Sequence, residues 1–251
     1  MTTLHSLNNY LEELLQASSI PDYCQNGIQV EGAPKIKKIA SAVTANLKTI
    51  ESAVNCKANA LIVHHGIFWN RDEHRIKGSK RSKLWLLLKN NISLLAYHLP
   101  LDLHRELGNN WKAAVDLGWK NLEPFGSLNN LIIGVKGTFN EIPINEFQKK
   151  LEEYYQHPAH VAFGGKKRVQ SAALISGGSY KSVNEAATEG LDCFISGNFD
   201  ESAWDTAYEE SINFLSLGHY ATEKIGVQTL GKQLSKKFNI KHDFLDIVNP
   251  F

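Results

Sequence analysis

The apolar positions in the first half of the chain follow two periods, one typical of helices and one typical of buried strands. Apolar residues at helical spacing predict helices at 4–15, 47–54, 84–88 and 108–118. Short apolar runs predict strands at 36–45, 60–63 and 92–97. Strands that alternate with helices indicate an α/β fold whose sheet is at least partly parallel.

The second half of the chain continues this alternation. Strands are predicted at 128–139, 159–163, 169–176, 191–196, 212–217 and 240–247, and helices at 144–154 and 222–238. A change of pattern near Pro124 is the best candidate for a domain boundary. We therefore expect two α/β domains with mixed sheets, the second inserted in the first, over residues 1–126, 127–213 and 214–251.

The charge balance argues against a polyanion as the main partner of this chain. Its 251 residues carry 27 Lys and Arg against 26 Asp and Glu, a formal net charge of +1. The N-terminus lacks the basic start and apolar run of a signal peptide. No apolar run approaches the ~20 residues that cross a bilayer. We expect a cytoplasmic protein with no membrane partner and no nucleic acid partner.

Three of the predicted strands are followed at once by side chains of the kinds that bind metal ions. In open α/β sheets, ligands bind beyond the carboxyl ends of the strands, so three such ends of one parallel sheet would bring these groups to one edge. A lone histidine is more often structural than a ligand, but three strand ends with the same arrangement favour a metal site. The candidate ligands are His64, His65, Asp102, His219 and Glu223.

The spacing of these residues makes a common centre plausible. His219 and Glu223 are four residues apart and share one face of a helix that begins at the histidine. His64 and His65 are adjacent, so on a regular strand they would point to opposite faces. Either the chain leaves strand geometry at this pair, which Gly66 permits, or each histidine serves a different ion.

The candidate ligand set contains three imidazoles and two carboxylates. Nitrogen and oxygen ligands without a thiolate suit Zn, Fe, Mn, Co or Ni. Five protein ligands shared between two divalent ions leave coordination positions open for water or substrate. Two such ions ~3.5–4 Å apart activate a water for attack in many hydrolases.

Four segments of the chain carry recognisable motifs: IVHHG, YHLPLDLHRELGNN, DYCQNGIQVEG and GHYATEKIGVQTLGKQL. They resemble the NGG-one-interacting-factor-three-like family, whose members are often labelled GTP cyclohydrolase 1 type 2 homologues. The order His-His-Gly, His-Leu-Pro-x-Asp and Gly-His-x-x-x-Glu is specific, and the resemblance covers almost the whole chain. It implies two α/β domains, a homohexameric ring and a dinuclear metal site at His64, His65, Asp102, His219 and Glu223.

The sequence departs from this family pattern at one position. Family members often carry an acidic residue after Ser/Thr-Gly in the second domain, whereas here Asn198 follows Gly197. If that acid contributes to the site, its role is lost or has moved to Asp200 or Glu201.

Four further features allow either a functional or a structural interpretation. His98 precedes Asp102 by four residues and is a candidate general acid or base, or a group that supports a ligand; a backbone hydrogen bond is an equal alternative. The segment from Asn26 to Gln29 is more often a tight turn. The basic residues within 71–83 could hold a phosphate-bearing ligand, but a solvated surface loop is commoner. The basic run 166–168 is more often a turn than a docking patch.

Two classes of function fit these features. The first is a metal-dependent hydrolase, similar to GTP cyclohydrolase 1 type 2, that acts on a nucleotide or another phosphate-bearing small molecule. The second is a non-catalytic metal-binding protein, or a scaffold or regulatory ring. A ring that binds DNA is a third and weaker hypothesis, because the net charge of +1 speaks against it.

Overall fold

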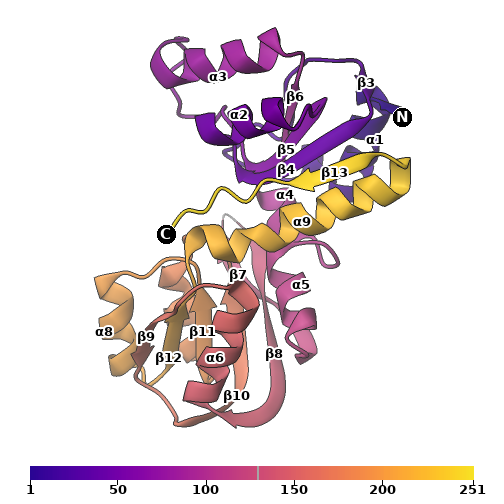
Figure 1. Ribbon diagram of the computed structural model, residues 1–251. Helices are drawn as coiled ribbons and strands as arrows, with labels where there is room; N and C mark the ends of the chain where they lie inside the picture. Colours follow the sequence, from indigo (N-terminus) through magenta and orange to yellow (C-terminus); the bar gives the residue numbers. More distant parts are fainter. Residues whose placement is uncertain (129) are drawn as a thin grey trace. The chain divides into compact units, whose positions relative to one another are not determined.

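The chain folds into two compact units (Figure 1). The computed structural model describes residues 1–128 and 130–251; Asn129, which falls in the strand predicted at 128–139, lies outside the described residues. Unit 1 comprises Met1–His104 and Gly226–Val248, and unit 2 comprises Arg105–Ile225 and Asn249–Phe251. The domain boundaries expected at 126/127 and 213/214 stay predictions.

Unit 1 is built on a mixed five-stranded sheet. Its order is β13-β4-β5-β6-β2. All neighbours are parallel except β2, which pairs antiparallel with β6 at the edge. The strands are β2 (Gly27–Val30), β4 (Lys38–Thr44), β5 (Ala60–His65), β6 (Ser93–Ala96) and β13 (Lys241–Phe244), and β1 (Thr2–Thr3) pairs separately with β3 (Lys35–Ile36).

Two helices of unit 1 begin where side chains cap their free backbone donors. The hydroxyl of Thr3 accepts the Ser6 N–H at the start of the first helix, and Asn46 accepts the Thr49 N–H at the start of the second. The first helix buries Leu4, Leu7, Leu11 and Leu15, as the helical spacing predicts. The helices are α1 (Leu4–Leu15), α2 (Leu47–Asn55), α3 (Gly78–Lys89), α4 (Leu99–Leu103) and the later turns of α9 (His219–Phe238).

Unit 2 contains a mixed six-stranded sheet of order β7-β8-β10-β11-β12-β9. Its centre, β10 to β12, is parallel, and β7, β8 and β9 pair antiparallel. The strands are β7 (Lys120–Leu128), β8 (Leu131–Pro143), β9 (His160–Phe163), β10 (Arg168–Ile175), β11 (Cys193–Ser196) and β12 (Asn213–Ser216). The helices are α5 (Asn109–Asp116), α6 (Ile144–Tyr155), α7 (Val183–Thr188), α8 (Glu201–Glu209) and the first turns of α9.

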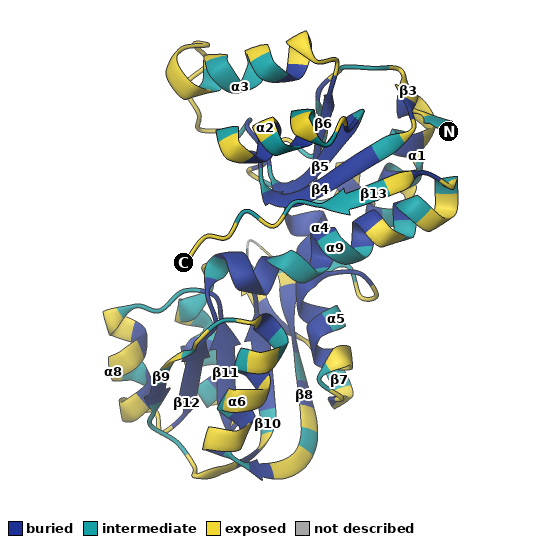
Figure 2. Ribbon diagram, viewed as in Figure 1, coloured by how far each residue is buried: buried dark blue, intermediate teal, exposed yellow. Residues whose placement is uncertain are grey.

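The central strands of both sheets are buried along almost their whole length (Figure 2). Such strands appear in the sequence as short continuous apolar runs, which is why the α/β class with mixed sheets was predictable and is confirmed. The elements β7, α4, α7 and α8 were not predicted, since they are short or mostly exposed and lack a clear apolar period. Within the described residues, no helix is long and apolar enough to span a membrane.

A buried carboxylate ties the parallel strands of unit 2 together. Asp192, which is 5% exposed, accepts hydrogen bonds from the N–H groups of Gln170 (3.0 Å) and Ser171 (3.2 Å). Its other oxygen pairs with Lys166 at 2.7 Å. Burial alone would raise the pKa of Asp192, but the Lys166 ammonium and the N–H donors outweigh it and lower this pKa. The basic run at 166–168 therefore serves structural ion pairs, because Arg168 likewise pairs with Glu141.

We predict that Asp192→Asn lowers the free energy of unfolding by about 2 kcal/mol at pH 7, the size expected for hydrogen bonds to a buried charged group. Urea denaturation measures this loss. The folded-state pKa lies below the unfolded value of about 3.9, so the carboxylate stabilises the fold above that value. The difference between wild type and variant should therefore shrink as the pH falls below about 4.

Lys166→Ala is the matched control, because it removes only the exposed partner of the same carboxylate. It should cost no more than ~1 kcal/mol. Equal losses from the two variants would contradict the role assigned to the buried hydrogen bonds.

Candidate metal centre

The parallel register of unit 1 brings three histidines together at the carboxyl ends of two strands. Val63 of β5 pairs with Ala96 of β6, so two residues further on His65 and His98 stand at the same level. One ring nitrogen from each of His64, His65 and His98 lies within 4.8 Å of the others. These three side chains form a group that could hold a metal ion.

The expectation that the chain leaves strand geometry at the histidine pair is wrong. Strand β5 runs through His65, which pairs with Thr44 of β4. The Ala45 N–H donates to the His65 carbonyl at 2.8 Å, which holds the backbone of His65 at the sheet. The two histidine rings nevertheless lie 4.7 Å apart at an interplanar angle of 45°. The side chains therefore converge at the end of the strand without a break in its pairing.

The ring of His64 is held in one orientation by the neighbouring strand. Its Nδ1 lies 3.0 Å from the Tyr97 carbonyl oxygen, which can only accept, so Nδ1 is the donor. In the neutral ring, Nε2 then carries a lone pair, and it lies 3.5 Å from Oδ2 of Asp102. His64 is fully buried and Asp102 is 7% exposed. Two lone-pair atoms that face each other in a buried site are the arrangement that a cation stabilises.

Unit 2 repeats this arrangement with different elements. Helix α9 begins at His219, and Nε2 of this residue lies 3.1 Å from Oε1 of Glu223, which confirms that the two share one helix face. Nδ1 of His219 lies 3.0 Å from Oδ1 of Asn198. The amide oxygen orients the ring, and Nε2 again faces a buried carboxylate.

The contact with His219 gives Asn198 a structural role at the position where the family pattern has an acid. A neutral amide oxygen accepts the histidine N–H as a carboxylate would, but adds no negative charge. Neither neighbouring acid replaces it: Asp200 accepts the Ser202 N–H at the start of α8, and Glu201 is exposed in the first turn of that helix. Asn198 therefore orients the ring of His219 without adding a negative charge.

Glycine at residue 177 allows the backbone to approach this histidine and carboxylate. Gly177 has φ +66°, and a Cβ at this position would lie 2.5 Å from Oε1 of Glu223 and 3.3 Å from Nε2 of His219. A side chain here would push both groups out of place. The Gly177-Gly178 pair appeared in the sequence only as a separator between strands.

Asp22 is a functional residue that the sequence analysis missed. Its Oδ1 accepts from Nδ1 of His98 at 2.9 Å, and its Oδ2 accepts from the Leu99 N–H at 2.9 Å. Burial would raise the pKa of Asp22, but the hydrogen bonds from His98, Asn26 and the Cys24 N–H outweigh it and lower the pKa to about 2. Asp22 is thus a carboxylate that fixes His98. No period or motif marks such a residue, because its partner lies 76 positions away.

The segment from Asn26 to Gln29 supports the site from the edge strand. Oδ1 of Asn26 accepts the His98 N–H at 2.9 Å, and Oε1 of Gln29 accepts the Ile67 N–H at 2.7 Å. A Cβ at Gly66 would lie 2.3 Å from that Gln29 oxygen. The interpretation as a simple tight turn is therefore incomplete, because these side chains hold the loops that follow β5 and β6.

The basic stretch at 71–83 makes several contacts within itself around Glu73, although it keeps an excess of positive charge. Glu73 pairs with Arg75 and, at 3.1 Å, with Lys77, and its backbone oxygen accepts from Lys80 at 2.9 Å. Such local pairs are typical of a solvated surface loop, which was the commoner interpretation.

A two-unit α/β protein with histidines and carboxylates at the ends of its parallel strands is the class that the fold and these groups define. The family model described as Duf34/NIF3 (NGG1p interacting factor 3) matches residues 2–250, and the chain belongs to this family. The resemblance drawn from the sequence motifs is thereby confirmed.

Relatives and solved structures agree over the full chain. A protein of Chlamydia pneumoniae named GTP cyclohydrolase 1 type 2 homolog is 52% identical and covers 98% of both chains. One of the same name from Pseudomonas aeruginosa is 38% identical, also over 98% of both. A solved structure described as "protein ybgI, unknown function" is 34% identical with a TM-score of 0.93 over 100% of both chains. The solved structure of TTHA1606 from Thermus thermophilus is 29% identical with a TM-score of 0.90, also over 100% of both.

We predict that Gly177→Ala weakens metal binding by about 10- to 100-fold, because the new Cβ displaces Glu223 and His219. Isothermal titration of the purified chain with Zn or Mn measures the change. Gly190→Ala is the control: this glycine also has a positive φ, +72°, but no atom lies within 4 Å of its added Cβ. Both variants lose about 1–2 kcal/mol of stability to backbone strain. Equal affinities in the two variants would contradict the packing argument.

Proposed function

We propose that this chain is a metal-dependent hydrolase that acts on a nucleotide or another phosphate-bearing small molecule. In this proposal two divalent ions, drawn from Zn, Fe, Mn, Co or Ni, are held by one dinuclear centre. Its ligands are His64, His65, Asp102, His219 and Glu223.

One observation carries the proposal: the same three-part arrangement occurs in both units. In each unit, an amide oxygen lies within hydrogen-bond distance of Nδ1 of a histidine. Nε2 of the same histidine faces a carboxylate oxygen, at 3.5 Å between His64 and Asp102 and at 3.1 Å between His219 and Glu223. Metal-binding histidines usually have their second nitrogen held in this way. The rival explanation is a doubly protonated imidazolium in an ion pair, which needs no metal.

Bound divalent ions would supply Lewis-acid polarisation of the substrate and activation of a water. Around them, the protein's own side chains would orient the reacting groups and exclude bulk water. His98 is 7% exposed and is fixed through Nδ1 by ionised Asp22, so its Nε2 is positioned to hold or transfer a proton. The rings of Tyr23 and Trp69 lie 5.0 Å and 5.2 Å from that of His98 and shield it from bulk water.

The relatives' name supports a nucleotide as the substrate class, because two of them are called GTP cyclohydrolase 1 type 2 homolog. The competing proposal is a non-catalytic metal-binding protein, or a scaffold or regulatory ring. It shares the metal site and differs only in the absence of turnover. In both cases we place the protein in the cytoplasm, without a nucleic acid or membrane partner.

We also propose that copies of the chain assemble as a homohexamer. Two helices carry exposed aromatic side chains: Trp85 on α3 is 51% exposed, and Trp204 on α8 is 44% exposed. The two helical segments carry opposite charges. Residues 78–89 contain four basic and no acidic side chains, and residues 201–210 contain four acidic and no basic ones. Exposed aromatic residues surrounded by opposite charges on two surfaces favour contacts between copies of the chain.

We predict that multi-angle light scattering finds six chains per particle and that Trp204→Glu lowers this number. A monomeric wild type would refute the assembly.

The metal content per chain tests the centre. Protein purified without chelator or affinity metal should contain close to two ions by mass spectrometry, and Asp102→Ala and His219→Ala should each lose at least one. His5→Ala, at an exposed histidine outside the site, should keep both. If wild type is empty and cannot be loaded, the ion-pair explanation replaces the metal centre.

Turnover by the same proteins separates the two functions. Screening nucleotides, phosphoesters and cyclic amides should reveal an activity that Asp102→Ala abolishes. His98→Ala should keep its metal and lose about 10²–10⁴-fold in rate if His98 transfers a proton. Loss of metal from His98→Ala would instead make it a ligand, as its distance to His64 and His65 allows. Full metal content with no turnover on any substrate supports the non-catalytic alternative.

A further inference from the structure

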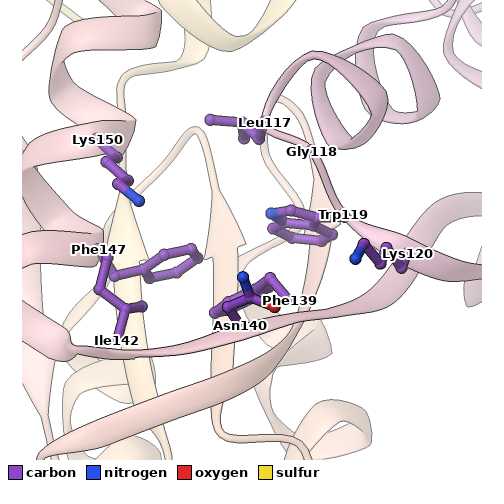
Figure 3. Close-up of a pocket in the computed structure, with 9 residues that line it drawn as sticks. All are labelled: Leu117, Gly118, Trp119, Lys120, Phe139, Asn140, Ile142, Phe147 and Lys150. Carbon is purple, nitrogen blue, oxygen red and sulfur yellow. The ribbon is translucent and has the colours of Figure 1, made fainter.

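A small pocket in unit 2 is lined by residues that take no part in the candidate metal centre (Figure 3). It lies between the end of α5, the beginning of β7, the end of β8 and one face of α6. Its volume is about 160 Å³. An apolar cavity of about 150 Å³ accommodates one benzene ring, so this pocket has room for a single six-membered ring and a small substituent.

Three aromatic rings form the wall of the pocket. The ring centroids of Trp119 and Phe139 are 5.6 Å apart, those of Phe139 and Phe147 are 4.7 Å apart, and those of Trp119 and Phe147 are 6.4 Å apart. Trp119 and Phe147 belong to the hydrophobic core of unit 2, which holds them rigidly, whereas Phe139 is only half-buried. Phe139 is therefore the ring whose exposed surface a flat ligand ring would contact, and the two buried rings hold it in place.

Two lysines bring positive charge to the same pocket. In Figure 3 the side chain of Lys150 enters from α6 and that of Lys120 from the beginning of β7. Neither ammonium forms an ion pair with any of the residues described at 1–128 and 130–251. The nearby carboxylate of Asp116 already pairs with Lys112 and accepts the Tyr154 hydroxyl at 2.9 Å. Two ammonium groups without an ion-pair partner among the described residues, beside a pocket walled by aromatic rings, attract an anion.

We propose that this pocket binds a small aromatic carboxylate, with one ring and one charged group. The ring lies against Phe139, beside Trp119 and Phe147, and the carboxylate faces the ammonium groups of Lys120 and Lys150. A planar carboxylate attached to the ring fits a volume of about 160 Å³, whereas a fused nucleobase with a sugar and phosphate does not. The proposal is independent of the metal centre and of the hydrolase function.

The alternative is that the rings are the edge of an ordinary core and the lysines are solvated. A titration of the full chain with benzoate, followed by the indole N–H signal of Trp119 in NMR, distinguishes the two. Benzoate should shift this signal with a dissociation constant on the order of 1 mM, as expected for so small a ligand. Benzamide, which has the same shape without charge, and cyclohexanecarboxylate, which has the charge without the flat ring, should each bind about tenfold more weakly.

Matched variants connect the binding to the pocket. Lys150→Ala should weaken benzoate binding by about fivefold or more, whereas Lys149→Ala, at the neighbouring exposed lysine outside the pocket, should not change it. Phe139→Leu keeps the apolar volume, avoids the fully buried rings and should also weaken binding. The proposal is overturned if benzoate leaves the Trp119 signal unchanged, if benzamide binds as well as benzoate, or if the two lysine variants behave alike.

Discussion

The site depends on one constraint: each candidate histidine has its Nδ1 held by an oxygen from a neighbouring strand end or loop. The carbonyl of Tyr97 holds His64, the hydroxyl of Thr44 holds His65, the carboxylate of Asp22 holds His98, and the amide of Asn198 holds His219. Because this nitrogen is occupied, the other nitrogen must face the interior of the site. Parallel pairing supplies this constraint for His64 and His219, since β5 lies beside β6 and β11 beside β12, and the holding residue follows the neighbouring strand.

This constraint explains why so much of the surrounding structure is polar and buried. Asp22 holds His98 and the loop that follows β6 and also accepts from Asn26 and the Cys24 N–H, and its pKa falls to about 2 because these donors stabilise its charge. Asn26 binds the backbone of the loop that follows β6, and Gln29 binds the backbone of the loop that follows β5. Buried polar networks are costly unless every member is satisfied, and a satisfied one is rigid. Rigidity of this kind lets a metal site keep open coordination positions.

The strands of the two sheets differ in how clearly the sequence predicts them. Central strands such as β5 and β12 are buried on both faces, so their apolar runs and the polar residues that follow were visible in the sequence. Strand β7 alternates irregularly and is largely exposed, so it was missed, and with it the pocket that its first residue helps to form. The ring wall of that pocket was hidden because Trp119, Phe139 and Phe147 are brought together only by packing.

The sequence by itself determined the α/β class, the family and the five candidate ligands, because apolar runs and short motifs are local properties of the chain. The tertiary structure decided which atoms face one another. It kept His65 within its strand, gave Asn198 the ring of His219 and turned Asp22 towards His98. Such contacts join residues tens of positions apart, and their distances follow from strand register and backbone approach at Gly177, which no local pattern encodes.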